Sequence, residues 1–147
     1  MCGIMGYTGT QAVEPIIIKG LEGLEYRGYD SAGIGVINEG KVHVYKTEGS
    51  PEKLWKEVPE KLHSFVGIGH TRWATHGAPS DINSHPHMSE DRVIAVVHNG
   101  IIENYLSIKE ELSAKGYRFV SETDTETECF IGDHSTFLNN AIIEIGT

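Results

Sequence analysis

Short apolar runs that come in pairs are the feature that most limits how this chain can fold. Residues 34–37 and 42–45 flank Asn38-Glu39-Gly40-Lys41, a turn signal typical of a β-hairpin. Further strands are expected at residues 2–8, 65–70, 93–97 and 117–120. Longer stretches with helical spacing separate the runs. This order predicts an α+β domain with largely antiparallel sheets rather than a repeated βαβ unit.

Two helices are expected in the first half of the chain. The first covers residues 11–26, where apolar residues recur at helical spacing and Pro15 lies in the first turn. The second opens with Ser50 as N-cap and Pro51 at the first helical position. Because such helices have one apolar face, we expect them to cover the sheets from outside.

Two more helices are expected in the second half. One covers residues 103–115 and ends at Gly116. The other begins at a capping box formed by Thr123 and Glu126. No internal repeat or linker is visible, so the pattern predicts one domain.

The acidic balance of the 147-residue chain excludes several classes of function. The net charge is −9, and no basic run exceeds two residues, which argues against a nucleic-acid surface. The longest apolar run, such as residues 16–18, is far too short to span a bilayer, and the N-terminus lacks the regions of a signal peptide. Two cysteines make a poor disulfide framework, so we expect a cytoplasmic protein with reduced thiols.

The cysteine directly after Met1 is the candidate nucleophile. Removal of Met1 would give Cys2 a free α-amine beside its thiol. An α-amine titrates at about 7.7–8.0, so it could act as the base for the thiol without help from a histidine. The alternative is that Cys2 is only a small apolar residue that opens a strand.

Three polar groups at the ends of apolar runs could complete a site. Arg72 is either a surface charge or a bidentate donor for a carboxylate. Asn99-Gly100 is either an ordinary turn or an oxyanion hole made of a side-chain amide and a backbone N–H. Asp124, at the first position of the fourth helix, either favours the helix dipole or holds an ammonium group. With Cys2, they predict amide hydrolysis or acyl transfer on a free amino acid.

Four histidines lie close together in the sequence and raise the question of a metal site. They are His70, His76, His85 and His87. Their spacing matches no standard zinc motif, so we expect no metal ion. We expect solvated loop histidines, or histidines packed at the rim of a site.

Five segments together closely resemble the glutaminase domain of the glucosamine-6-phosphate synthase family, the isomerising glutamine–fructose-6-phosphate aminotransferases. They are CGI at 2–4, EYRGYDSAG at 25–33, GHTRWATHG at 69–77, HNGIIEN at 98–104 and SETDTE at 121–126. The resemblance runs from Cys2 to about Glu126. It implies the N-terminal-nucleophile hydrolase fold, an αββα sandwich of two antiparallel sheets between helical layers.

The same resemblance implies a role for each site residue. Cys2 would be the nucleophile, with its own α-amine as base, and Asn99 with Gly100 would form the oxyanion hole. Arg72 would hold the α-carboxylate of L-glutamine, and Asp124 its α-ammonium group. The loop that closes over bound glutamine would contain Trp73, Thr75, His76 and Gly77. The resemblance implies no metal ion or organic cofactor.

In this family the released ammonia reaches sugar-isomerase domains, where fructose 6-phosphate becomes glucosamine 6-phosphate, and we expect the full-length protein to form a homodimer. Those domains are absent here, so residues 1–147 are expected to be a truncated amidotransferase domain. Residues 127–147 no longer resemble the family. Two alternatives stay open: an inert or partner-binding fragment, or the glutaminase domain of another class II amidotransferase, such as amidophosphoribosyltransferase or asparagine synthetase.

Overall fold

Two antiparallel sheets form the centre of the molecule in a computed structural model, which describes residues 2–60, 62–74, 77–131 and 140–144. The first sheet has the strand order β1-β4-β2-β3. Its strands are β1 (Gly3–Thr8), β2 (Ser31–Asn38), β3 (Lys41–Glu48) and β4 (Val66–Arg72). The second sheet has the order β5-β6-β7, with β5 (His87–Met88), β6 (Ile94–His98) and β7 (Asn140–Glu144).

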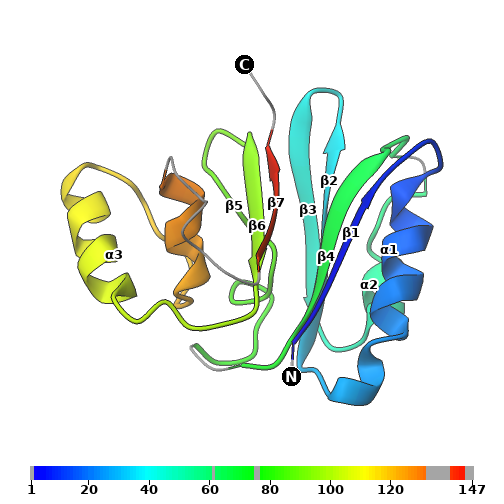
Figure 1. Ribbon diagram of the computed structural model, residues 1–147, viewed down its shortest axis with the longest axis horizontal. Coiled ribbons are helices and arrows are strands. Elements are labelled where there is room, and N and C mark those ends of the chain that lie inside the picture. The colour runs from blue at the N-terminus through cyan, green and yellow to red at the C-terminus, as the bar shows by residue number, and fades with distance from the viewer. Residues whose placement is uncertain (1, 61, 75–76, 132–139, 145–147) are drawn as a thin grey trace.

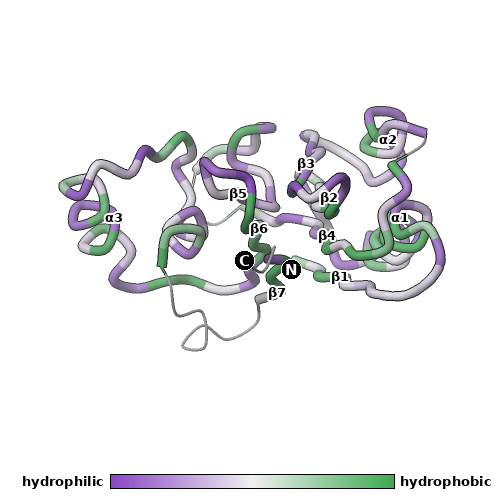
Figure 2. Tube along the Cα trace, turned by 90° about the horizontal axis from the view of Figure 1, so that it is seen from above, coloured by the Kyte–Doolittle hydropathy of each residue, from purple (hydrophilic) through white to green (hydrophobic). Residues whose placement is uncertain are grey.

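Helices lie on the outer side of each sheet. They are α1 (Val13–Glu22), α2 (Pro51–Trp55) and α3 (Tyr105–Ala114), with two 3₁₀ helices, η1 (Glu25–Arg27) and η2 (Thr125–Phe130). In Figure 1, α1 and α2 cover the first sheet, whereas η2 packs on the second sheet with α3 beyond it. Figure 2 shows the same sequence of layers from above. This arrangement confirms the predicted αββα sandwich with antiparallel sheets.

The first core lies between α1, α2 and the first sheet. Val13, Ile17, Ile18 and Leu21 of α1 are buried, so the apolar positions that predicted this helix are those that contact the sheet. The helix is shorter than expected and ends at Glu22. The second helix is only five residues long, and the Oγ of its predicted N-cap, Ser50, accepts the backbone N–H of Lys53 across 3.1 Å.

The second core fills the space between the two sheets. Its buried members come from both sheets and are Val42, Ile68, Ala95, Val97 and Ile143. Strands β4 and β6 both contribute to this core, and each of them ends at a polar segment that the sequence singled out. The packing of one sheet on the other therefore fixes how the ends of β4 and β6 lie relative to each other.

The hairpin between β2 and β3 confirms the predicted turn. Asn38 pairs with Lys41, which leaves Glu39 and Gly40 as the two loop residues. Their φ angles are 50° and 71°, and positive values at both positions define the type I′ turn that suits a twisted hairpin. The strands extend further than predicted and run eight residues each.

The strand predicted at residues 117–120 is wrong. This segment is irregular, because its polar backbone is bound by a side chain rather than by a strand: the Val120 N–H donates to Oε1 of Glu126 across 2.9 Å. The rings of Tyr117 and Phe119 pack on the ring of Phe130 instead of on a sheet. The apolar residues that suggested a strand therefore pack on η2.

The predicted capping box is also wrong. The Glu126 carboxylate accepts the N–H groups of Val120 and Ser121, which precede the helix, and Thr123 Oγ1 lies 2.7 Å from Nε2 of His87. Asp124 is the N-cap of η2 rather than its first residue. Strands β5 and β7 were not predicted, and Gly132 and Asp133, expected to break the fourth helix, lie outside the described residues.

The third helix is confirmed with slightly shorter bounds. Its partly or fully buried face contains Tyr105, Ile108 and Leu112, as expected from their spacing. Gly116 follows the helix with a φ of 97°, the left-handed conformation that ends many helices. Across the part of the chain that the structure describes, we find no helix with the length and apolar character needed to cross a membrane.

Candidate functional site

A cavity of about 230 Å³ lies where β1 begins and where β4 and β6 end. The predicted site residues in its wall are Cys2, Arg72, Trp73, Asn99, Gly100 and Asp124. The first two segments meet because β1 and β4 are antiparallel, with Gly3 opposite Thr71. Residues that are as far apart in sequence as 2 and 124 therefore share one cavity.

The thiol of Cys2 is held by the backbone that follows β4. The N–H of Trp73 donates to Sγ across 3.1 Å, and Sγ lies 3.6 Å from the carbonyl oxygen of the same residue. The neighbouring N–H of Gly3 donates to Oγ1 of Thr71 across 3.1 Å. The sequence had suggested a role for the Trp73 side chain only. The backbone contact could not be predicted, because any residue type carries an N–H.

Asn99 and Gly100 lie beside this thiol. The Asn99 amide donates from Nδ2 to the carbonyl oxygen of Cys2 across 3.2 Å. Since an amide nitrogen carries two hydrogens, this contact uses one of them. A Cβ at position 100 would lie 2.8 Å from Nε2 of His98, so the close approach of the His98 ring requires a glycine there. The ordinary-turn interpretation of this segment does not account for its place in the cavity wall.

Arg72 is buried rather than a surface charge, with 4% of its surface exposed. Its Nη2 and Nη1 donate to the carbonyl oxygens of Gly77 and Ala78 across 3.0 and 3.4 Å. Asp30, which the sequence had not assigned to the site, brings a carboxylate oxygen to 4.0 Å from Nη1. The other oxygen of this carboxylate accepts the N–H of Ala74. Asp30 thus fixes both the arginine and the segment that follows it.

The loop predicted to close over a substrate is described in part. Trp73 is 54% exposed at the cavity mouth, whereas Thr75 and His76 lie outside the described residues. Gly77 has a φ of 76°, a conformation that favours glycine. It does not line the cavity itself, and its carbonyl oxygen binds Arg72.

Asp124 is buried at the opposite wall of the cavity. Its Oδ2 accepts the N–H of Ile102 across 2.8 Å, and its Oδ1 accepts the N–H of Thr125 across 3.0 Å. Two backbone donors thus stabilise the charged form of the carboxylate. Each carboxylate oxygen can accept a further hydrogen bond, so the group retains the capacity to bind a cation in the cavity.

The histidines are not solvated, so that part of the prediction is wrong. His70, His85 and His87 are buried, and His70 and His85 line the site cavity. Burial lowers the pKa of His70 to about 3 and those of His85 and His87 well below the usual value for histidine, so all three are neutral near pH 7. His76 lies outside the described residues. Within the described ranges, no group of three or more His, Cys, Asp or Glu residues could hold a metal ion.

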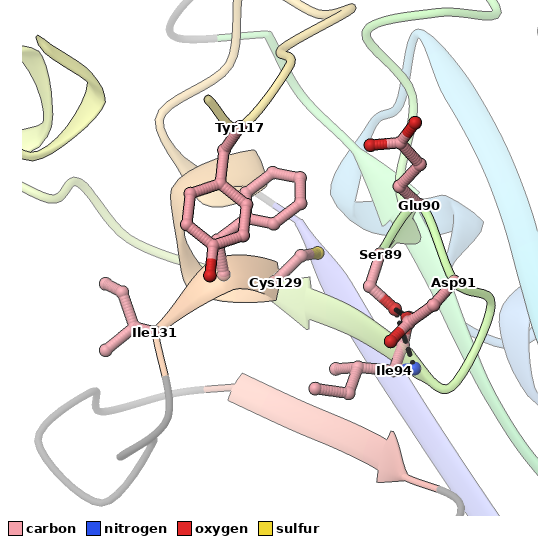
Figure 3. Close-up of a pocket in the computed structure, with 8 residues that line it drawn as sticks. Ser89, Glu90, Asp91, Ile94, Tyr117, Cys129 and Ile131 are labelled. Carbon is pink, nitrogen blue, oxygen red and sulfur yellow. Dashed lines mark hydrogen bonds between the residues drawn. The ribbon is translucent and has the colours of Figure 1, made fainter. Parts of the chain in front are cut away.

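A larger cavity, of about 450 Å³, lies on the far side of β6 from β4 and contains none of the predicted site residues. Figure 3 shows Tyr117 and Cys129 on one wall, with Ser89, Glu90 and Asp91 opposite them. Cys129 is a free, buried thiol, and burial raises its pKa, so it stays protonated and unreactive at neutral pH. The chemistry therefore belongs to the smaller cavity.

Comparison with known proteins gives one family and a consistent set of relatives. The family model described as "Glutamine amidotransferase domain" matches residues 57–131. A glutamine–fructose-6-phosphate aminotransferase (isomerizing) from Caldanaerobacter subterraneus subsp. tengcongensis is 52% identical over 146 residues, which cover 98% of this chain and 24% of the relative. The enzyme of the same name from Methanosarcina acetivorans is 57% identical over 128 residues, covering 86% of this chain and 21% of the relative.

Solved structures show the same fold. The glutamine phosphoribosylpyrophosphate amidotransferase of B. subtilis, complexed with ADP and GMP, superposes with a TM-score of 0.74 at 26% identity and covers 94% of this chain and 30% of its own. A structure described as the allosteric regulatory enzyme of purine biosynthesis gives a TM-score of 0.73 at 26% identity. The chain spans about a quarter or less of the length of the curated relatives described above.

Proposed function

This chain belongs to the glutamine amidotransferase family, and we propose that it is the glutaminase part of an enzyme that makes glucosamine 6-phosphate from fructose 6-phosphate and glutamine. The observation that carries the proposal is the shared cavity of Cys2, Arg72, Asn99, Gly100 and Asp124, which offers a nucleophile, oxyanion donors, one cation and one anion. The names of the relatives at 52% and 57% identity support the sugar enzyme over the phosphoribosyl enzyme at 26%.

The proposed reaction begins with the thiol of Cys2. Its proton passes to the α-amine of the same residue, and Sγ forms a bond to the side-chain carbonyl carbon of glutamine. The carbonyl oxygen becomes an oxyanion, which accepts hydrogen bonds from the Asn99 amide and the Gly100 N–H. The C–N bond then breaks, the nitrogen takes the proton back and leaves as ammonia, and a thioester remains. Water adds to the thioester, the C–S bond breaks, and glutamate leaves.

Recognition of the free amino acid needs one cation and one anion. We assign the α-carboxylate of glutamine to Arg72, whose planar guanidinium matches a carboxylate, and the α-ammonium group to Asp124. Asp30 supports the arginine from behind, since its carboxylate lies 4.0 Å from Nη1. Trp73, Thr75, His76 and Gly77 belong to the loop that we expect to cover the bound substrate. A peptide-bonded glutamine lacks both charges and would bind poorly.

The ammonia formed here needs an acceptor, and we propose that sugar-isomerase domains in the full-length protein provide it, in a cytoplasmic homodimer. We further propose that residues 1–147 form part of one amidotransferase domain, in which the family pattern runs from Cys2 to Glu126. The pairing of β1 with β4 and of β6 with β7 supports a single unit, because it joins the two ends of the described chain through the two packed sheets.

Glutamate release by the purified chain tests this function. We expect the wild-type chain to release glutamate from L-glutamine and Cys2→Ala to release none above background. Cys129→Ala is the matched control, because it removes the other thiol outside the site, and it should keep the activity. Equal background rates in the wild type and Cys2→Ala would refute the proposal and favour an inert fragment. Release from γ-glutamyl peptides blocked at the α-amine would refute the assignment of Asp124.

A further inference from the structure

A column of buried imidazoles runs behind the site cavity. The rings of His70 and His85 are stacked, with centroids 4.3 Å apart and planes inclined by 16°. The ring of His87 meets that of His85 edge-on at 4.8 Å. None of the three is placed to act as the nucleophile or its base in the proposed reaction. Burying three polar rings carries a desolvation cost, so their contacts need an explanation.

Each ring contacts the backbone or side chain next to a site residue. Nε2 of His70 donates to the carbonyl oxygen of His98 across 3.1 Å. The N–H of His98 donates to Nδ1 of His85 across 3.3 Å. His98 is the last residue of β6, so two imidazoles hold both polar backbone groups of the residue that immediately precedes Asn99 and Gly100.

The same column reaches the other two strand ends. His70 lies on β4 two residues before Arg72. Nε2 of His87 lies 2.7 Å from Oγ1 of Thr123, the residue before Asp124. A contact in the backbone lets the column pass close to β2: a Cβ at position 33 would lie 1.9 Å from the carbonyl oxygen of His85, so Gly33 is required there.

We propose that His70, His85 and His87 are positioning residues that hold the oxyanion segment Asn99-Gly100 in register with the carboxylate-binding and ammonium-binding ends of the site. This inference rests on the proposed glutaminase function. The column acts through the backbone of His98 and through Thr123, and it touches no reacting atom. Their neutral state fits the role, since each bond to His98 needs one protonated and one unprotonated ring nitrogen. A displacement of about 1 Å in such a segment can cost on the order of 100-fold in rate.

Isosteric variants separate positioning from packing. His70→Leu removes the donor to His98, and His70→Gln keeps a nitrogen donor near the position of Nε2. His85→Leu and His85→Asn form the matching pair for the acceptor. We expect each Leu variant to lose roughly tenfold or more in kcat for glutamine with less than about threefold change in KM, because the oxyanion acts in the transition state. The polar isostere should restore most of kcat. His43→Gln, on β3 away from the cavity, is the control and should match the wild type.

A second readout distinguishes the oxyanion segment from the nucleophile. Alkylation of Cys2 by iodoacetamide forms no oxyanion, so its rate should stay within about twofold of the wild type in the Leu variants, in contrast to the roughly tenfold loss of glutaminase rate. Alkylation that falls in parallel with glutamine hydrolysis would overturn the inference. Equal losses in His70→Leu and His70→Gln would also overturn it, because they would point to packing alone.

Thr123→Val covers the case in which a Leu variant does not fold. It removes the hydroxyl that contacts His87 at nearly constant volume, and we expect a lower kcat with a normal alkylation rate. Wild-type kcat in this variant and in both polar isosteres and Leu variants that fold would refute positioning, while the glutaminase function would stand. If the wild-type chain releases no more glutamate than Cys2→Ala, the function itself fails, and the inference fails with it.

Discussion

The backbone N–H of Trp73 points at the sulfur of Cys2 across 3.1 Å, although the two residues are 71 positions apart in the sequence. Pairing of β1 with β4 creates this contact, because the start of one strand lies beside the end of the other. The nucleophile is therefore positioned by sheet geometry, and the loop that begins at Trp73 is attached directly to it. Movement of this loop on substrate binding would be felt at the sulfur.

Asp30 should control substrate binding through Arg72. Asp30→Ala removes the carboxylate beside the guanidinium and the acceptor for the Ala74 N–H, so we expect KM for glutamine to rise roughly tenfold and the free energy of unfolding to fall by about 1–3 kcal/mol. Asp30→Asn keeps an acceptor and should recover stability but not KM. Steady-state kinetics and denaturant unfolding measure both effects. Glu52→Ala, in an exposed pair with Lys56, is the control and should change neither.

Gly100→Ala should reduce turnover. The added Cβ would lie 2.8 Å from the His98 ring, so either the ring or the oxyanion segment must move. We expect kcat to fall at least about tenfold with little change in KM, as for loss of an oxyanion donor. Gly6→Ala is a matched control, because a Cβ there would have no atom within 4 Å. A Gly100→Ala enzyme with normal kcat would contradict the assigned role.

Acid should destabilise the fold through the buried histidines. The pKa of His70 falls from 6.5 to about 3 in the folded chain, so below pH 6.5 the unfolded chain binds a proton that the native chain does not. Stability therefore falls as the pH drops from 6.5 toward 3. Between pH 7.5 and 5.5, His70→Gln should lose about 1.4 kcal/mol less than the wild type. Urea unfolding at the two pH values measures this difference; equal losses would contradict a neutral, buried His70.

Removal of Met1 should be required for activity. While Met1 is attached, the nitrogen of Cys2 is an amide and cannot act as a base. Intact-mass measurement of the active fraction should therefore find only chains that begin at Cys2. A variant in which an uncleaved tag precedes Met1 should fold and melt normally and release no glutamate. Active chains with Met1 in place would show that the base is another group.

The sequence was informative wherever a local signal decides the structure. The type I′ turn at Glu39-Gly40 and the cap at Ser50 depend on a few neighbouring residues, and both were predicted correctly. The segment at residues 117–120 was predicted wrongly, because its apolar residues pack on η2, whose position depends on the whole fold.

The site shows the same division. Side chains with unusual chemistry, such as Cys2 and Arg72, were found from the sequence, and the structure brings them together. Asp30 was missed because its partner is 42 positions away, and an aspartate in a glycine-rich loop gives no sign of it. The burial of the histidines was missed because alternation with polar neighbours resembles a loop, and only the second sheet covers them.

The site has an unusually high contact order, since Cys2 meets Trp73 and Asn99 at sequence separations of 71 and 97. The ribosome makes the nucleophile first and supplies its partners last, because Asp124 follows it by more than a hundred residues. During synthesis the cysteine is an ordinary thiol on an unfinished strand. The chain thus delays hydrolysis of the cell's glutamine until folding has closed the longest loops in the domain.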